Sequence, residues 1–447
     1  MELTLLGPRN ASVAWRTSFP AAAHVGRGLA QPTIWSATSS GVEHEAQLGA
    51  LEPGSAYVAE ITAVDAWGRT ATAALQFETP PATTPPTPAI RGDTITFDDQ
   101  PVFLRMTWEQ CDDRRDHAIA YGITTAMAPV CEAPARAPKA GDGSNSTIVP
   151  TDHQGPLPAA AIGRYYPDEW DTSLPNDVRE EDLRAAAPVA DDEITFLTLT
   201  NHFYSHAEPL AQGRGMYPAL VALADVVGFD LYPLQVWCRD GELAHVFLAQ
   251  QELERMVGVK PTYQWIEVKA MEHCPQRSEL APTAATVRAE TWLAVAGGAD
   301  AIGYFPNTWD MDVGSELART NRELTELAPA LLAPDADATS DTEAVRVGAR
   351  TLNGAVYVIA VNTTRAPATA RIGIANGAGR LATVLGESRQ VEVAPDNTVL
   401  EQFEPLAVHL YVLPPLRAAP PHEESDGVDY LRRTKGSARS ARTAHPA

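Results

Sequence analysis

The chain has 447 residues, of which 45% are hydrophobic and 20% are charged, and this suits roughly two to four globular domains. Its formal net charge of −23 argues against a nucleic-acid partner, because phosphate binding needs a clustered basic surface. No apolar run of about eighteen residues occurs, so we expect no membrane insertion. The N-terminal stretch MELTLLGPRN has neither the basic nor the apolar region of a signal peptide.

Residues 1–80 show the alternating pattern of β-strands, with Val13 and Trp15 on one strand face and a second alternating run from Tyr57. A Pro-Gly turn signal lies in the stretch LEPGSAY, which ends at Tyr57. The tryptophan, this corner and the closing strand resemble a fibronectin type III domain, and a β-sandwich of another family is the alternative. Residues 81–92 are rich in proline and are predicted to be an extended linker.

Residues 93–335 alternate between apolar strand signals and helical segments. The predicted strands are 101–108, 124–129, 146–150, the run from Ile162, 194–200, 224–232, 262–269 and 301–309. Eight such strands with helices between most of them predict a (β/α)₈ TIM barrel.

The remainder of the chain returns to β-strand patterns. Residues 340–415 are predicted to form a C-terminal antiparallel β-sandwich, for which packing against the barrel is preferred over sugar binding. Residues 416–447 are polar and rich in proline, and we expect a disordered tail. The predicted fold is therefore multidomain, with a TIM barrel between two β-sandwiches.

Two aromatic strands of the predicted barrel end in carboxylates. The first is IGRYYPDEWD, in which Asp168 and Glu169 precede Trp170, and the second is TYQWIEVK, which carries Glu267. Carboxyl groups carry out the chemistry of glycoside hydrolysis, and aromatic faces stack on the C–H surfaces of pyranose rings. This combination predicts a sugar site.

The active site of a TIM barrel lies at the C-terminal ends of its strands, where this chain carries carboxylates, an amide, imidazole and aromatic groups. We find no activated Ser or Cys pair, no Gly-rich phosphate loop and no metal-ligand spacing, so no metal or cofactor is expected. The predicted substrate-binding residues are Trp108, Asp168, Trp170, His202, Tyr204, Asp230, Tyr232, Trp265, Asn307 and Trp309.

Glutamates after the fourth and seventh strands, a tryptophan after the eighth and a trailing β-sandwich resemble a clan A retaining glycoside hydrolase. The resemblance covers about residues 95–415 and implies that Glu169 is the acid/base and Glu267 the nucleophile of a double displacement. Such a pair needs carboxyl groups about 5–5.5 Å apart. Asp168 stands where the clan usually has an asparagine that binds the sugar 2-hydroxyl, so contacts at that position are expected to differ.

Simpler interpretations of these residues stay open. Glu169 fits a solvated loop tip, Glu267 fits an ion pair with Lys269, Asp230 fits a brace for its turn, and the tryptophans fit the core. The alternative function is a non-catalytic glycan-binding or structural protein of a cell surface or virion, with the fibronectin-like domain as the route into the assembly.

The four cysteines follow predicted strands one, two, six and seven, and therefore lie at the same face of the barrel. Pairing Cys111 with Cys131 and Cys238 with Cys274 is the arrangement that links neighbouring loops. Two such disulfides would imply an oxidising compartment, and hence an extracellular or cell-surface protein. Four free thiols in a cytosolic protein are the alternative.

Overall fold

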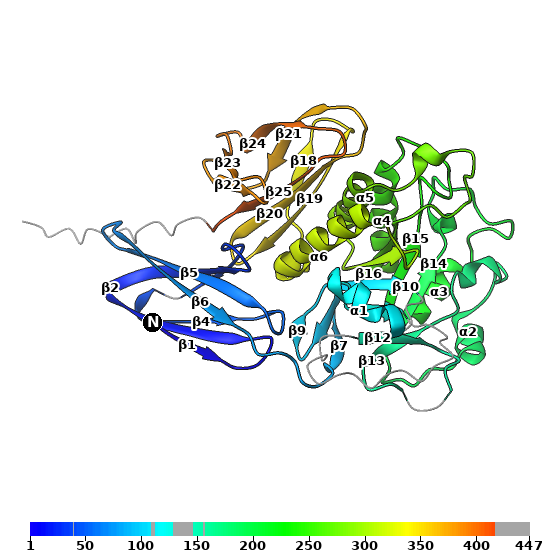
Figure 1. The fold of residues 1–447 in the computed structure, drawn as a ribbon, viewed down its shortest axis with the longest axis horizontal. Helices are drawn as coiled ribbons and strands as arrows, with labels where there is room; N and C mark the ends of the chain where they lie inside the picture. Colours follow the sequence, from blue (N-terminus) through cyan, green and yellow to red (C-terminus); the bar gives the residue numbers. More distant parts are fainter. Residues whose placement is uncertain (39, 109–111, 128–145, 155–156, 416–447) are drawn as a thin grey trace, which may run out of the picture.

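The computed structural model describes residues 1–38, 40–108, 112–127, 146–154 and 157–415, and these form three bodies (Figure 1). The N-terminal β-domain lies beside the barrel, and the C-terminal β-domain packs on the barrel helices α5 and α6. The predicted division at residues 80, 92, 335 and 340 stays a prediction.

The central body is a closed barrel of eight parallel strands, as the sequence predicts. Each predicted strand has a counterpart, although the first begins later, at Leu104 rather than Pro101. The strands are β10 (Leu104–Trp108), β11 (Thr125–Met127), β12 (Ser146–Pro150), β13 (Ala161–Tyr165), β14 (Thr195–Leu199), β15 (Val226–Asp230), β16 (Thr262–Glu267) and β17 (Ala301–Phe305).

Six helices are described in the barrel region. They are α1 (Asp112–Ala120), α2 (Glu180–Ala186), α3 (Tyr217–Leu223), α4 (Ala244–Val257), α5 (Ala284–Gly297) and α6 (Met311–Leu331). Helix α5 is buried from Thr286 to Gly297, because it packs on β16 and β17 and also on strands of the C-terminal domain. Its apolar residues on all sides follow from this double contact.

The end of the barrel opposite the strand C-termini is covered by a small sheet of β7 (Pro88–Arg91), β8 (Thr94–Phe97) and β9 (Gln100–Pro101). Ile95 and Phe97 pack with barrel residues such as Met106 and Phe196. Because β7 pairs with β8, the second part of the predicted linker 81–92 belongs to a sheet.

The N-terminal domain is built around one long strand, β2 (Ala11–Gly28). Its first half pairs with β1 (Glu2–Leu5) and β4 (Gly41–Leu48), and its second half with β3 (Ile34–Ala37) and β5 (Ala56–Asp65), which pairs with β6 (Thr70–Glu78). The Tyr57 hydroxyl accepts a hydrogen bond from the backbone N–H of Glu52 at 2.8 Å and so closes the predicted corner. The fibronectin type III assignment itself stays a prediction.

The C-terminal domain contains two sheets that share one core. The larger has β19 (Val345–Leu352), β20 (Ala355–Asn362), β25 (Val408–Leu413), β22 (Leu381–Val384) and β23 (Arg389–Glu392). The smaller has β18 (Ala338–Ser340), β21 (Ala368–Ile374) and β24 (Thr398–Phe403).

Residues 33–35 of the N-terminal domain contact both other domains. The Thr33 hydroxyl donates to Glu326 of α6 at 2.9 Å, and the Thr33 carbonyl accepts from the Tyr357 hydroxyl of β20 at 2.9 Å. Ile34 and Trp35 belong to the same apolar cluster as the barrel helices. The three domains therefore meet at one junction.

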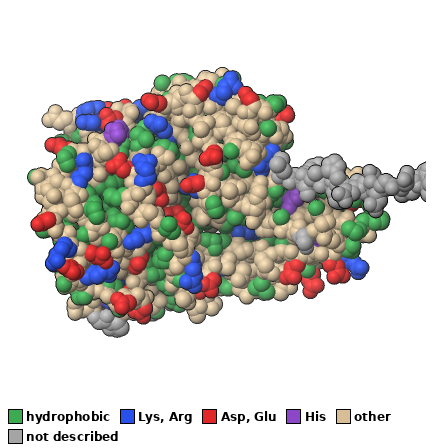
Figure 2. Space-filling model, turned by 180° about the vertical axis from the view of Figure 1, so that it is seen from behind, with side chains coloured by type: hydrophobic (Ala, Val, Ile, Leu, Met, Phe, Trp, Pro, Cys, Tyr) green, Lys and Arg blue, Asp and Glu red, His purple; other side chains and the backbone are tan. Residues whose placement is uncertain are grey.

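The surface carries interspersed acidic and basic side chains on the face shown in Figure 2. Among the described helices, none is long and apolar enough to cross a membrane.

Candidate active site

A pocket of about 430 Å³ lies at the C-terminal ends of the barrel strands. Its position follows from the parallel topology, because all eight strands present their last residues to the same face. The residues that line it are Trp108, Asp168, Glu169, Thr172, Thr198, Thr200, Asn201, His202, Asp230, Tyr232, Val236, Trp265, Met271, His273 and Phe305.

Three carboxyl groups converge in this pocket. Asp230, the last residue of β15, lies close to Glu169 and Asp168, and all three side chains line the pocket. Burial raises the pKa of Asp230 well above its ordinary value, and the charges of Glu169 and Asp168 raise it further. Two carboxyl groups close together disfavour a state in which both are ionised, so one acts as an acid beside a carboxylate.

The loop after β13 holds Glu169 in an uncommon backbone conformation. Its φ of 47° and ψ of 40° lie in the left-handed region, which residues with a side chain rarely adopt. Two residues later, Asp171 is fully buried and accepts hydrogen bonds from the Thr200 hydroxyl, the Thr200 backbone N–H at 3.1 Å and the Tyr217 hydroxyl at 2.9 Å. This anchor fixes the loop to β14 and α3, so the strained residue is held in place and turned toward the pocket.

Aromatic rings form much of the pocket wall. Trp108 meets Trp265 edge to face, with ring centroids 5.8 Å apart, while Tyr232 and Phe305 are stacked at 5.9 Å. The indole N–H of Trp265 donates to the Thr198 hydroxyl at 3.2 Å, which fixes the ring orientation. Such walls suit the C–H faces of a sugar ring.

Polar groups from the end of β14 complete the lining. The Nδ1 atom of His202 lies 2.6 Å from the carbonyl oxygen of Glu208, to which it donates, so a neutral ring presents Nε2 as an acceptor. Arg214 donates to the carbonyl oxygens of His202, Tyr204 and Ala207 and so holds this loop. Asn201 and Thr200 add further groups able to hydrogen-bond to hydroxyls.

The predicted nucleophile Glu267 is not among the residues that line the pocket. It is 0% exposed, and its two carboxyl oxygens accept the backbone N–H groups of Leu234 and Gln235, each at 2.8 Å. Burial raises its pKa to about 8, although both N–H donors act in the opposite direction. The carboxyl group that the structure brings to Glu169 is therefore that of Asp230, whereas Glu267 supports the loop after β15, and the predicted Glu169–Glu267 pair stays a prediction.

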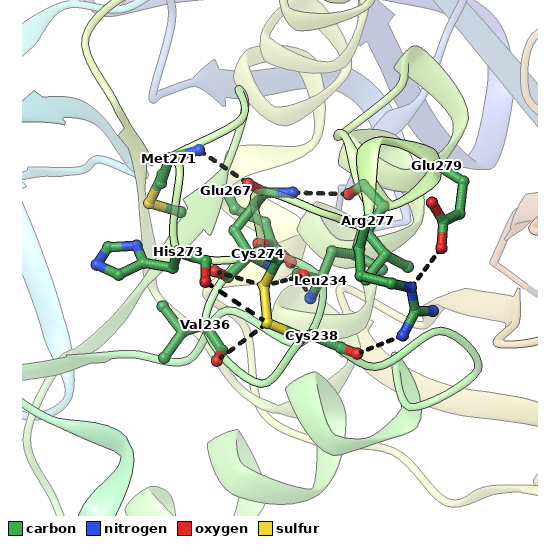
Figure 3. The surroundings of a disulfide bond; sticks show 11 residues. Leu234, Val236, Cys238, Glu267, Met271, His273, Cys274, Arg277 and Glu279 are labelled. Atoms are coloured by element: carbon green, nitrogen blue, oxygen red, sulfur yellow. Dashed lines mark hydrogen bonds and ion pairs between the residues drawn. A yellow bond between two sulfur atoms is a disulfide. The ribbon is translucent and has the colours of Figure 1, made fainter.

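Two loops at the pocket rim, which lie next to Glu267, are linked covalently. Figure 3 shows Leu234, Val236 and Cys238 on the loop after β15 and Met271, His273 and Cys274 on the loop after β16. Cys238 and Cys274 form a disulfide with Cα atoms 5.7 Å apart, as predicted. The Gln235 side chain adds a second link, since it accepts from the Met271 backbone N–H and donates to the Leu280 carbonyl, both at 2.8 Å. The predicted Cys111–Cys131 pair lies outside the described residues.

Four predicted substrate-binding residues do not line the pocket. Trp170 stacks on Tyr166 with centroids 5.9 Å apart, and Tyr204 is 1% exposed with its hydroxyl 2.7 Å from Nδ1 of His245. Trp309 stacks on His117 of α1 with ring centroids 5.4 Å apart. Asn307 is half-buried beyond β17.

Several lining residues were not predicted, namely Thr172, Thr198, Thr200, Asn201, Val236, Met271, His273 and Phe305. Phe305 is the last residue of β17 and is recognisable by the strand-end rule. Val236, Met271 and His273 lie on rim loops, whose course the strand pattern does not define.

Within the described parts of the chain, no group of three or more His, Cys, Asp or Glu side chains is arranged to hold a metal ion. The candidate site is thus a carboxyl cluster with aromatic walls at the mouth of a TIM barrel.

The sequence matches no protein-family model, and a search of curated proteins finds no significant match. Among solved structures, similar ones include a Bacteroides fragilis protein described as a candidate alpha-galactosidase/melibiase, which is 10% identical, with a TM-score of 0.47 and coverage of 92% of this chain and 94% of the other. A cyclomaltodextrinase is 8% identical with a TM-score of 0.44, covering 92% and 98% respectively. A family 30 endoxylanase from Clostridium papyrosolvens is 12% identical with a TM-score of 0.41, covering 74% and 100%. These likenesses are too distant to assign an activity.

Proposed function

We propose that the protein is a glycoside hydrolase that cleaves a poly- or oligosaccharide at the pocket on the barrel face. The observation that carries this proposal is the proximity of Asp230 and Glu169 within a pocket walled by Trp108, Tyr232 and Phe305. Paired carboxyl groups supply the acid and the nucleophile or base of glycoside hydrolysis.

Asp230 acts as the general acid. Its raised pKa keeps it protonated, so that it can donate to the glycosidic oxygen as the bond to the leaving sugar breaks. Glu169 supplies the carboxylate that attacks the anomeric carbon, and Asp230 then removes a proton from the water that hydrolyses the ester. The proximity of the two side chains fits this retaining route, in which the carboxyl groups stand about 5–5.5 Å apart, better than an inverting route, in which they stand about 6.5–9.5 Å apart to hold a water between.

Asp168 lies at the pocket mouth, where its charge acts on Asp230. We assign it to the binding of a substrate hydroxyl, together with His202 and Asn201. None of the described residues that line the pocket is Lys or Arg, and this favours a neutral sugar.

The Cys238–Cys274 disulfide supports an extracellular or cell-surface location, since such bonds persist in oxidising compartments. An N-terminal fibronectin type III-like domain is a common companion of this setting and forms part of the same proposal.

The test is a screen of aryl glycosides and neutral polysaccharides with the wild type and the variants Asp230→Asn, Glu169→Gln and Asp396→Asn. We expect each pocket variant to lose about 10³-fold or more in kcat/KM on the substrate found, with the remote Asp396→Asn control unchanged. The anomer released first, followed by NMR, should retain its configuration.

Turnover that survives both pocket substitutions would overturn the assignment. If the wild type binds oligosaccharides in the pocket and cleaves none, the non-catalytic glycan-binding alternative holds instead.

A further inference from the structure

An exposed aromatic pair lies on the N-terminal domain. Trp67, in the turn between β5 and β6, is 70% exposed, and Phe19 of β2 is 49% exposed. Their rings meet edge to face with centroids 5.9 Å apart. The guanidinium of Arg69 lies 4.8 Å from the Phe19 ring centroid and 4.9 Å from that of Trp67, so three planar groups form one cluster.

The turn holds these groups in a fixed arrangement. One carboxyl oxygen of Asp65 accepts the backbone N–H groups of Trp67 at 3.0 Å and Arg69 at 2.9 Å, and the other accepts Nε of Arg69 at 2.6 Å. Although burial opposes it, these donors hold the pKa of Asp65 below its usual range. On the other side, the pairing of β2 with β4 shifts register between Arg16 and Ala21, which sets Phe19 apart from the regular sheet.

The core of the domain does not use these rings. Its apolar cluster includes Trp15, Tyr57 and Phe77, and neither Phe19 nor Trp67 belongs to it. A rigid turn therefore presents to water an indole that contributes little burial to the fold. Preorganised aromatic and arginine side chains of this kind are typical of binding surfaces.

The size of the cluster indicates a small ligand. Of the other exposed large apolar residues of this domain, Leu5 and Leu6 lie beside Ala11, eight residues along β2 from Phe19, or about 26 Å away. Met1 adjoins Glu2, which pairs with Ala14, five residues or about 17 Å from Phe19. A stable protein interface buries about 800 Å² on each partner, and two rings and a guanidinium provide far less.

We propose that Trp67, Phe19 and Arg69 form a second carbohydrate site, a platform for a neutral polysaccharide chain. The open face of the indole stacks on the C–H face of a sugar ring, while the guanidinium donates to hydroxyl groups. Pairing with Asp65 offsets the charge of Arg69, so a neutral chain is favoured. The choice of a saccharide rests on the proposed function, because a second anchor on the same polymer raises its effective concentration at the pocket.

Co-sedimentation with insoluble cellulose, xylan, mannan, β-1,3-glucan and starch granules tests the platform. The full chain carrying Asp230→Asn is used so that no polysaccharide is cleaved. Trp67→Ala and Phe19→Ala are each added to this chain separately. Leu400→Ala, which removes a 62% exposed side chain of β24, is the matched control. We expect the Asp230→Asn chain to co-sediment with at least one of these polysaccharides. Adding Trp67→Ala should weaken its binding about tenfold, whereas adding Leu400→Ala should leave it unchanged.

The proposal is overturned if the Asp230→Asn chain binds none of the five polysaccharides. It is also overturned if the chain with Trp67→Ala added binds as well as the Leu400→Ala control. It is also overturned if Trp67→Ala changes the oligomeric state, since the rings then serve a contact between copies. Turnover of a soluble aryl glycoside by Trp67→Ala with Asp230 intact should equal that of the wild type. That assay reports on the pocket alone, so a failure of the proposed hydrolase is distinguishable from a failure of the platform.

Discussion

The three acids of IGRYYPDEWD lie within four residues of one another and have three different environments. Asp168 lies at the pocket mouth, Glu169 contacts Asp230, and Asp171 is buried as the anchor of the loop. The sequence alone shows only that three acids lie close together. The path of the backbone determines which side chain is exposed to water, which faces the pocket and which binds a buried hydroxyl.

At the residue scale, the charge of Asp168 should set the pH range of activity. A raised pKa keeps Asp230 protonated, and activity is lost as the pH rises through that pKa. Asp168→Asn removes one of the charges that raise it, so the alkaline limb of the kcat/KM profile should move to lower pH. Asp396→Asn should leave the profile in place, and an unmoved limb in Asp168→Asn would contradict this coupling.

Glu267→Gln distinguishes a supporting residue from a nucleophile. Glutamine offers one oxygen to two backbone donors and turns its NH₂ group toward the other, so unfolding should become easier by about 1–3 kcal/mol. Thermal melting should show a lower Tm, while turnover persists at reduced kcat. By contrast, Glu169→Gln should keep its Tm and lose turnover.

Azide provides an independent check on the same pair. Glu169→Ala should regain turnover with azide and release a glycosyl azide of inverted configuration, because the small anion takes the place of the missing nucleophile. Rescue of Glu267→Ala instead would restore Glu267 as the nucleophile.

At the scale of elements, the strand pattern predicted all eight barrel strands and the end of the barrel that holds the site. It did so because each strand is a short apolar run ending in polar or aromatic residues. The pattern does not distinguish Glu267 from Asp230, because each is the last residue of its strand. The difference arises from the loop after β15, which folds over β16 and turns two N–H groups onto Glu267, a tertiary contact that strand periodicity does not encode.

The disulfide between the two rim loops should matter for both stability and binding. It closes a loop of 36 residues, for which chain entropy predicts a stabilisation of about 3–4 kcal/mol. A double Cys238→Ser, Cys274→Ser variant should melt at lower temperature and show a higher KM, since Val236 and His273 lose their fixed positions. A KM equal to that of the wild type would show that the rim loops do not touch the substrate.

At the scale of the whole molecule, buried carboxyl groups should make stability fall as the pH rises. Burial raises the pKa of Glu290 in α5 well above its ordinary value, with Glu267 adding to the effect, and its two carboxyl oxygens have no hydrogen-bond partner within the described structure. Above the unfolded pKa of about 4.5, the folded chain then binds more protons than the unfolded chain, and stability decreases with pH.

Glu290→Gln should flatten that dependence by up to about 1.4 kcal/mol per pH unit. Melting curves between pH 5 and pH 8 measure it, with the variant close to the wild type at pH 5 and more stable at pH 8. Equal slopes for the two proteins would show that Glu290 ionises as freely in the folded state as in the unfolded chain.

The junction at residues 33–35 restricts the evolutionary exchange of the N-terminal domain, because this domain contributes to a core that it shares with the other two. Ile34 and Trp35 belong to the core that they share with the barrel helices. Removal of residues 1–80 would therefore leave a cavity beside those helices, and Glu326 and Tyr357 would lose their hydrogen bonds to Thr33. The N-terminal domain is for this reason not a module that recombination can exchange freely. Calorimetry of the full chain should show one cooperative transition, and lineages that retain the barrel should retain all three domains together.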